Sequence, residues 1–149
     1  MTKQNSIIPS AESFRHRTKV EVRFADMDSF GHVNNASFLT FIEQARIKYF
    51  DDISGWHYDA SKEGVILAHA SLNFIRPLDF KESLSVLTLC TGIGNKSISL
   101  VHRIIAGEKE EVATAESVVV AFDYTSMKSV SVPQKWRDAI DKFEKGNMQ

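Results

Sequence analysis

Residues 23–46 read RFADMDSFGHVNNASFLTFIEQAR, and the rest of the chain is organised around this stretch. Its first half holds two carboxylates, a histidine, a glycine and two asparagines, a composition typical of a turn. Its second half carries apolar residues at helical spacing, and the pattern continues beyond it: Phe38, Phe41, Ile42, Ala45, Tyr49 and Phe50. The sequence therefore predicts a turn rich in reactive groups that leads directly into a long helix.

The predicted helix has a start signal and a stop signal. Asn34 or Asn35 is suited to cap the first turn, and Gly55 is a standard stop residue. About nineteen residues of helix span roughly 28 Å at 1.5 Å per residue, which suits the central helix of a small domain. Because apolar residues also occur on its other sides, we expect the helix to be enclosed on more than one side. These additional residues are Leu39, Ile47 and Ile53.

Strand patterns flank this stretch on both sides. In residues 17–24, Val20, Val22 and Phe24 alternate with charged residues, which is the period-two pattern of a half-buried strand. Four more strand patterns follow the helix, and a short helix is predicted over residues 133–143. Short turns between successive strands favour antiparallel pairing. The sequence therefore predicts an α+β fold in which a curved, antiparallel, five-stranded sheet wraps one long central helix.

Length and composition indicate one ordinary globular domain. The chain has 149 residues, and we expect an N-terminal tail over residues 1–16 and a single domain over residues 17–145. The net charge of −1 favours neither nucleic acid nor an anionic membrane. Cys90 is the one cysteine, so no intrachain disulfide forms and a reducing cytoplasm is the simplest compartment. We see no secretory signal and no apolar run long enough to insert into a membrane, so we expect a cytoplasmic protein.

The turn before the helix combines groups that can perform chemistry on a carbonyl. A carboxylate from Asp26 or Asp28 can act as a general base on water or as a nucleophile. The first N–H groups of a helix have no partner within it, so they can bind the oxygen of a polarised carbonyl. Gly31 permits a tight reversal and close approach by a substrate. Each residue taken singly also has an ordinary structural interpretation, as a cap, a turn former or a hydrogen-bonded histidine.

Other kinds of site find little support in the sequence. Asp26, Asp28 and His32 lack a further ligand nearby, so we expect no metal site. The chain has no nucleophile elbow, P-loop or dinucleotide-binding turn. We interpret Cys90 as an inert buried thiol within a strand, and His69 and His102 as structural histidines.

The string DMDSFGHVNNASFL, followed by FIEQAR, closely resembles the signature of hotdog-fold thioesterases. The resemblance is to the 4-hydroxybenzoyl-CoA thioesterase-like superfamily, which includes bacterial acyl-CoA thioesterases and plant acyl-carrier-protein thioesterases. It covers roughly residues 19–126, and its specific part is residues 26–46. It implies hydrolysis of an acyl-CoA thioester to a free acid and coenzyme A, with no cofactor other than the coenzyme A of the substrate. It also implies a homodimer, or a tetramer built as a dimer of dimers, with active sites between subunits.

The resemblance assigns roles to individual residues. Asp28 falls on the carboxylate that acts as nucleophile or general base, and Asn35 on the helix-start residue whose N–H polarises the carbonyl. His32 matches the histidine of the plant-type HVNN motif, where it belongs to the catalytic group, and Asn34 is expected to brace the turn. Phe30 replaces an asparagine of the plant enzymes, and Asn35 replaces a histidine of a bacterial subgroup. The division of labour between Asp28 and His32 therefore stays open.

Three residues outside the turn are candidates for coenzyme A contacts. Arg76 beside Pro77, and Lys96 and Ser97 after a glycine-asparagine turn, lie where relatives place such contacts. Each has an equally good interpretation as an ordinary solvated residue.

Three alternatives to an acyl-CoA hydrolase stay open at this point. They are a non-catalytic module that binds acyl thioesters, an acyl-carrier-protein thioesterase, and a hotdog dehydratase. The helix lacks the separated Asp and His pattern of the dehydratases. Glu43 and Arg46, three residues apart on the helix, are expected to pair with each other or to meet another subunit.

Overall fold

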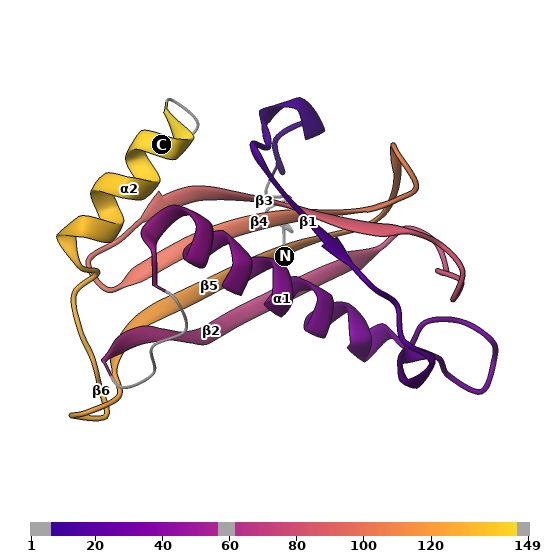
Figure 1. Ribbon diagram of the computed structural model, residues 1–149, viewed down its shortest axis with the longest axis horizontal. Coiled ribbons are helices and arrows are strands. Elements are labelled where there is room, and N and C mark those ends of the chain that lie inside the picture. Colours follow the sequence, from indigo (N-terminus) through magenta and orange to yellow (C-terminus); the bar gives the residue numbers. More distant parts are fainter. Residues whose placement is uncertain (1–6, 57–61, 146–149) are drawn as a thin grey trace, which may run out of the picture.

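The computed structural model describes residues 7–56 and 62–145, so part of the predicted N-terminal tail lies outside the described residues. One long helix, α1 (Asn35–Ser54), lies across one face of an antiparallel sheet (Figure 1). The strands are β1 (His16–Val20), β2 (Glu63–Phe74), β3 (Leu84–Ile93), β4 (Ser97–Ala106), β5 (Glu110–Asp123) and β6 (Lys128–Ser129). A second helix, α2 (Gln134–Glu144), and the 3-10 turns η1 (Ala11–Ser13) and η2 (Phe24–Asp26) complete the described elements. The predicted α+β hotdog architecture is confirmed.

The sheet has the order β1-β3-β4-β5-β2, and the two-residue β6 pairs with one end of β5. All of these pairings are antiparallel, as the short turns predict. The five predicted strands are therefore present, and β6 is an addition too short to give a sequence pattern. β2 forms one edge of the sheet, and α2 packs where α1 ends (Figure 1).

Helix α1 begins and ends where its sequence signals predict. Asn34 is its N-cap, and Gly55 ends it with a φ of 67°, a left-handed conformation that favours glycine. The six apolar residues that predicted its inner face are all buried against the sheet. Leu39 is instead 43% exposed, so the helix is less enclosed than expected along the side that carries this residue.

The first predicted strand is wrong at its end. β1 stops at Val20, and Phe24 lies in the turn η2 with 83% of its surface exposed. The cause is Asp26, whose carboxylate accepts hydrogen bonds from the backbone N–H and the guanidinium of Arg23 and so folds the chain into a turn. The alternating pattern still describes burial at Val20 and Val22, which both lie in the core.

A buried polar row crosses the face of the sheet beneath α1. His102 on β4 is fully buried, and its ring nitrogens lie 3.1 Å from the Thr88 hydroxyl and 2.9 Å from the Ser117 hydroxyl. Burial, helped by the nearby Arg46 guanidinium, lowers the pKa of His102 to about 3, so its ring is neutral. These contacts agree with the structural interpretation of His102. Arg46 is buried and Glu43 exposed, and no ion pair joins these two described residues.

The opposite face of the sheet is covered in part by the chain ahead of β1. The Arg103 guanidinium donates to the carbonyls of Ile8 and Pro9 at 3.0 and 2.8 Å, and it pairs with Glu111. Cys90 is buried within β3, as expected of an inert thiol. Among the described residues, no helix is both long enough and apolar enough to cross a bilayer.

Candidate active site

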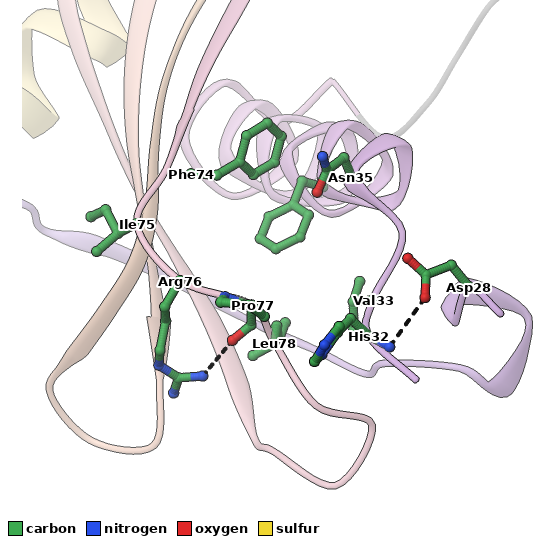
Figure 2. A pocket seen from close by; sticks show the side chains of 10 residues that line it. Asp28, His32, Val33, Asn35, Phe74, Ile75, Arg76, Pro77 and Leu78 are labelled. Atoms are coloured by element: carbon green, nitrogen blue, oxygen red, sulfur yellow. Dashed lines mark hydrogen bonds between the residues drawn. The ribbon is translucent and has the colours of Figure 1, made fainter. Parts of the chain in front are cut away.

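A cleft of about 300 Å³ opens between the start of α1 and the loop that follows β2 (Figure 2). The turn before α1 and the helix itself contribute Asp28, His32, Val33, Asn35 and Phe38. The end of β2 and its loop contribute Phe74, Ile75, Arg76, Pro77 and Leu78. The three residues predicted to be catalytic, Asp28, His32 and Asn35, therefore line one cleft, together with Arg76 from the predicted coenzyme A contacts.

The turn that carries Asp28 is closed by backbone hydrogen bonds. The Asp28 N–H donates to the His32 carbonyl at 2.8 Å, and the Gly31 N–H donates to the Asp28 carbonyl at 3.3 Å. Gly31 has a φ of 83°, which a residue with a side chain rarely adopts. Gly31 and Asn34 do not line the cleft, so their contribution is to the shape of the turn.

Asp26 and Asp28 are two residues apart and lie in different surroundings. Asp26 is 2% exposed, and its pKa is lowered mainly by the hydrogen bonds from the Arg23 side chain. Its carbonyl accepts the Asn34 N–H at 2.7 Å, directly before the helix. Asp26 thus braces the turn, and its carboxylate does not line the cleft.

The Asp28 carboxylate is oriented by its own turn and keeps one oxygen open. Its Oδ1 accepts the backbone N–H groups of Phe30 and His32 at 2.9 and 3.2 Å. None of the described residues donates to Oδ2. In Figure 2 this carboxylate points towards the helix start, whereas the His32 ring points towards the loop of Pro77 and Leu78. The His32 ring also makes no hydrogen bond with the part of the chain that the structure describes.

At the helix start, Asn35 lines the same cleft as Asp28, and its N–H has no partner among the described residues. The side chain of Asn34 accepts the Ala36 N–H at 2.9 Å, and its carbonyl accepts the Ser37 N–H at 2.9 Å. No described group accepts the Asn35 N–H, which lies in the first turn of α1. A free donor at this position carries the positive end of the helix dipole. It can therefore bind a developing negative charge.

Arg76 lines the cleft, but its guanidinium is already engaged. It binds Glu82 and Glu110, with shortest distances of 2.6 and 2.7 Å, and it donates to the Pro77 carbonyl at 2.7 Å. Its two carboxylate partners together outweigh its charge. The free cation that the sequence suggested for phosphate is therefore not present at this position.

Lys96 and Ser97 lie at the other end of the sheet. Ser97 pairs with Val120, and Val120 pairs with Ile66 near the start of β2, whereas the cleft lies beyond Phe74 at the end of that strand. At about 3.3 Å per residue this separation is roughly 25 Å. The Lys96 ammonium instead contacts the Ser129 hydroxyl at 3.4 Å. A single chain does not bring these residues to the cleft.

The apolar walls of the cleft were only partly predictable. The apolar helix face predicted Phe38, which lines the cleft, and Phe41, which is instead buried in the core. The walls that sequence reasoning missed come mainly from Phe74 and Leu78. The one available signal was Pro77, which ends the strand ladder and turns the following residues back towards the helix start.

Comparison with known proteins places this geometry in a family. The family model described as the thioesterase-like superfamily matches residues 22–140. The long-chain acyl-CoA thioesterase FadM of Escherichia coli (strain K12) is 23% identical over 132 residues, which cover 87% of this chain and 99% of FadM. The acyl-CoA thioester hydrolase YbgC of Escherichia coli O157:H7 is 26% identical over 120 residues, with 79% and 90% covered.

Solved structures agree with these relatives. A thioesterase from Thermus thermophilus, solved in complex with coenzyme A and Zn, has a TM-score of 0.78 and 32% identity. The alignment covers 89% of this chain and 96% of that one. The family resemblance of residues 26–46 is therefore confirmed. The chain belongs to the thioesterase-like superfamily and has its hotdog fold.

Proposed function

We propose that the cleft hydrolyses an acyl-CoA thioester to a free carboxylic acid and coenzyme A. One observation carries the proposal: Asp28, with an oriented carboxylate and one free oxygen, lines the same apolar-walled cleft as Asn35, whose helix-start N–H has no partner among the described residues. A nucleophile or base next to an oxyanion donor is the arrangement that acyl transfer needs. The names of the relatives support coenzyme A as the thiol carrier.

The thioester carbonyl oxygen would accept the Asn35 N–H, with the acyl chain against the apolar walls. The Asp28 carboxylate then either attacks the carbonyl carbon or removes a proton from a water molecule that attacks it. Negative charge develops on the carbonyl oxygen and is stabilised by the N–H and the helix dipole. Collapse breaks the C–S bond, and the coenzyme A thiolate leaves and takes up a proton. On the nucleophilic route, water then hydrolyses the acyl-aspartyl anhydride.

His32 is proposed as a second catalytic group. Its ring lines the cleft and is free of hydrogen bonds to described residues, so it is able to exchange protons there. A His32→Gln variant that loses much less activity than Asp28→Asn would assign the attack step to Asp28 alone. Comparable losses would show that both groups take part.

We further propose that two chains pair through the free edge of β2, with dimers able to pair again. This edge strand exposes Ile66, Leu67 and Phe74, each between 40% and 45%, as expected of a surface that is covered in an assembly. Twofold antiparallel pairing would place the start of the partner's β2 beside the end of this one. Lys96 and Ser97 of one chain would then lie at the same end of the paired sheets as the cleft of the other chain.

The test of the hydrolase proposal is Asp28→Asn, assayed by thiol release on short, long and aromatic acyl-CoAs. We expect turnover to fall by about 100-fold or more, which is the loss typical of removing one group that stabilises charge in the transition state. We expect the melting temperature to stay unchanged. Asp79→Asn is a matched control, because Asp79 is exposed on the loop after β2 and does not line the cleft. Near-normal turnover of Asp28→Asn would remove Asp28 from the chemistry. Absence of thiol release by the wild-type protein on every substrate would contradict the hydrolase proposal.

A further inference from the structure

The loop after β2 is bonded directly to the segment that precedes the helix start. The Leu78 side chain is fully buried, and its carbonyl accepts the Val33 N–H at 2.9 Å. Val33 is two residues ahead of Asn35, which lines the cleft. The position of this loop therefore helps to determine where the proposed oxyanion donor lies relative to Asp28.

The guanidinium of Arg76 ties this loop together. Two of its nitrogens reach the two oxygens of Glu82 at 2.6 and 3.1 Å, and Nε and Nη2 reach the two oxygens of Glu110 at 2.7 and 2.9 Å. Glu82 also accepts the Asp79 N–H at 2.8 Å, inside the same loop. We call Arg76, Glu82 and Glu110 the Arg76 clip. It joins the two ends of the loop to the start of β5.

The charges of the Arg76 clip argue against a role in binding phosphate. One guanidinium faces two carboxylates, which sum to a net charge of −1 when all three groups are ionised. Hydrogen bonds from Arg76 lower the pKa of Glu82, so this carboxylate stays ionised near neutral pH. A phosphate group of coenzyme A would have to displace a carboxylate that already accepts two hydrogen bonds from the planar guanidinium.

We propose that the Arg76 clip is a positioning device, which holds the Leu78 carbonyl against Val33 and so places the Asn35 N–H for the reaction. Arg76 acts through the backbone and does not contact the phosphates of the substrate. This inference rests on the proposed hydrolase function. Small displacements of an oxyanion donor cost large factors in rate, whereas partly exposed ion pairs contribute little to global stability. The clip should therefore affect turnover far more than folding.

Glu82→Gln separates the clip from a phosphate site, because the two predict opposite results. For a clip, Glu82→Gln and Arg76→Gln both lower kcat by about 10-fold with little change in KM, and Arg76→Lys fails to restore it because an ammonium lacks the fork. For a phosphate site, Arg76→Gln raises KM at unchanged kcat, and Arg76→Lys is nearly normal. Glu82→Gln would then lower KM, because it releases positive charge. The second set of results would overturn the proposal.

Amide hydrogen exchange at Val33 gives a readout that does not depend on activity. We expect faster exchange at Val33 in Arg76→Gln and Glu82→Gln, with unchanged protection at Asn34, whose N–H bonds to Asp26 instead. Unchanged protection of the Val33 amide in both variants would also overturn the proposal that the clip positions the helix start. Arg103→Gln is the matched control, since it removes another Arg–Glu pair on neighbouring strands but leaves this loop untouched. Asp28→Asn assayed in parallel shows separately whether the hydrolase proposal itself holds.

Discussion

The two ends of the sheet use the same functional group in opposite ways. At the cleft end, Asp28 keeps one carboxylate oxygen open, and it shares the cleft with Asn35, whose helix-start N–H has no partner among the described residues. At the α2 end, Glu144 is fully buried, and its carboxyl accepts the Cys90 N–H at 2.6 Å. Burial raises the pKa of Glu144 and favours its neutral form. Partners and burial, rather than residue type, therefore decide whether a carboxylate is available for chemistry.

The Glu144 contact has a simple origin in the sheet. β1 begins at His16, which pairs with Thr88, so the strand does not extend far enough to pair with Cys90. The carboxyl of Glu144 on α2 supplies the acceptor that a longer β1 would provide. The same helix holds the turn after β3, because Arg137 donates to the Gly94 and Asn95 carbonyls at 2.7 and 2.8 Å. The α2 end is therefore built for rigidity, in contrast to the cleft end.

The largest predicted effect is on the α2 end. Glu144→Ala should lower the free energy of unfolding by about 3 kcal/mol, because it leaves a buried N–H unpaired and a space beside Tyr49. For a chain of this size the melting temperature would fall by roughly 10 °C. Thermal unfolding followed by circular dichroism measures this loss. The kcat of the folded protein at low temperature should change little, and a large loss of kcat would show that the two ends are coupled.

Glu144→Gln is the matched control, because it keeps the shape and the acceptor. Since burial raises the pKa of Glu144, its stabilising contribution is full at acid pH and is lost as pH rises through the raised pKa. The glutamine variant has no such titration. It should therefore gain stability relative to wild type as pH rises. Parallel curves of stability against pH for the two proteins would show that Glu144 does not have a raised pKa.

The next effect is acid sensitivity from His102. The folded protein keeps this ring neutral down to a pKa of about 3, whereas the unfolded chain binds a proton below about pH 6.5. Stability is therefore full above about pH 6.5 and falls as pH drops towards 3. Urea unfolding from about pH 4 to about pH 7 measures the slope. His102→Gln should remove this component, so wild-type and variant curves of equal slope would contradict it.

A smaller effect is expected on substrate choice at the cleft. The Phe74 ring lines the cleft and lies edge-on to Phe38, with 5.2 Å between ring centroids. Phe74→Ala should shift the ratio of kcat/KM values towards bulkier acyl groups by about 10-fold, as a larger apolar pocket does. Ile66→Ala is the control, because Ile66 lies near the other end of β2 with similar exposure. An equal shift in both variants would assign the effect to the strand edge instead.

The smallest effect tests the helix start itself. Asn34→Ala removes the cap and should cost about 1 kcal/mol of stability. Asn34→Asp keeps an acceptor for the Ala36 N–H and should retain stability. Its added negative charge beside the oxyanion site should nevertheless lower kcat several-fold. If Asn34→Asp keeps full kcat, the negative charge of the transition state does not develop near this end of α1.

Sequence alone determined the features that depend on neighbours along the chain. The caps at Asn34 and Gly55, the apolar face of α1 and the reactive turn at Asp28 are local patterns of spacing and turn chemistry. The strand predicted over residues 17–24 ends early for an equally local reason. The Asp26 carboxylate accepts the Arg23 N–H and folds the chain into a turn, although the period-two pattern of apolar residues continues there. The signature in residues 26–46 was specific enough to identify the family.

Only the tertiary structure decided which polar groups are free. Arg76 and Glu110 are 34 residues apart, and Cys90 and Glu144 are 54 apart, so no local pattern shows that these groups are paired. The opposite placement of Lys96 and the cleft likewise follows from sheet register. Chain spacing specifies helices, strands and turns, but hydrogen-bond partners and burial depend on which surfaces meet. Those contacts leave Asp28 open to the cleft and enclose Glu144.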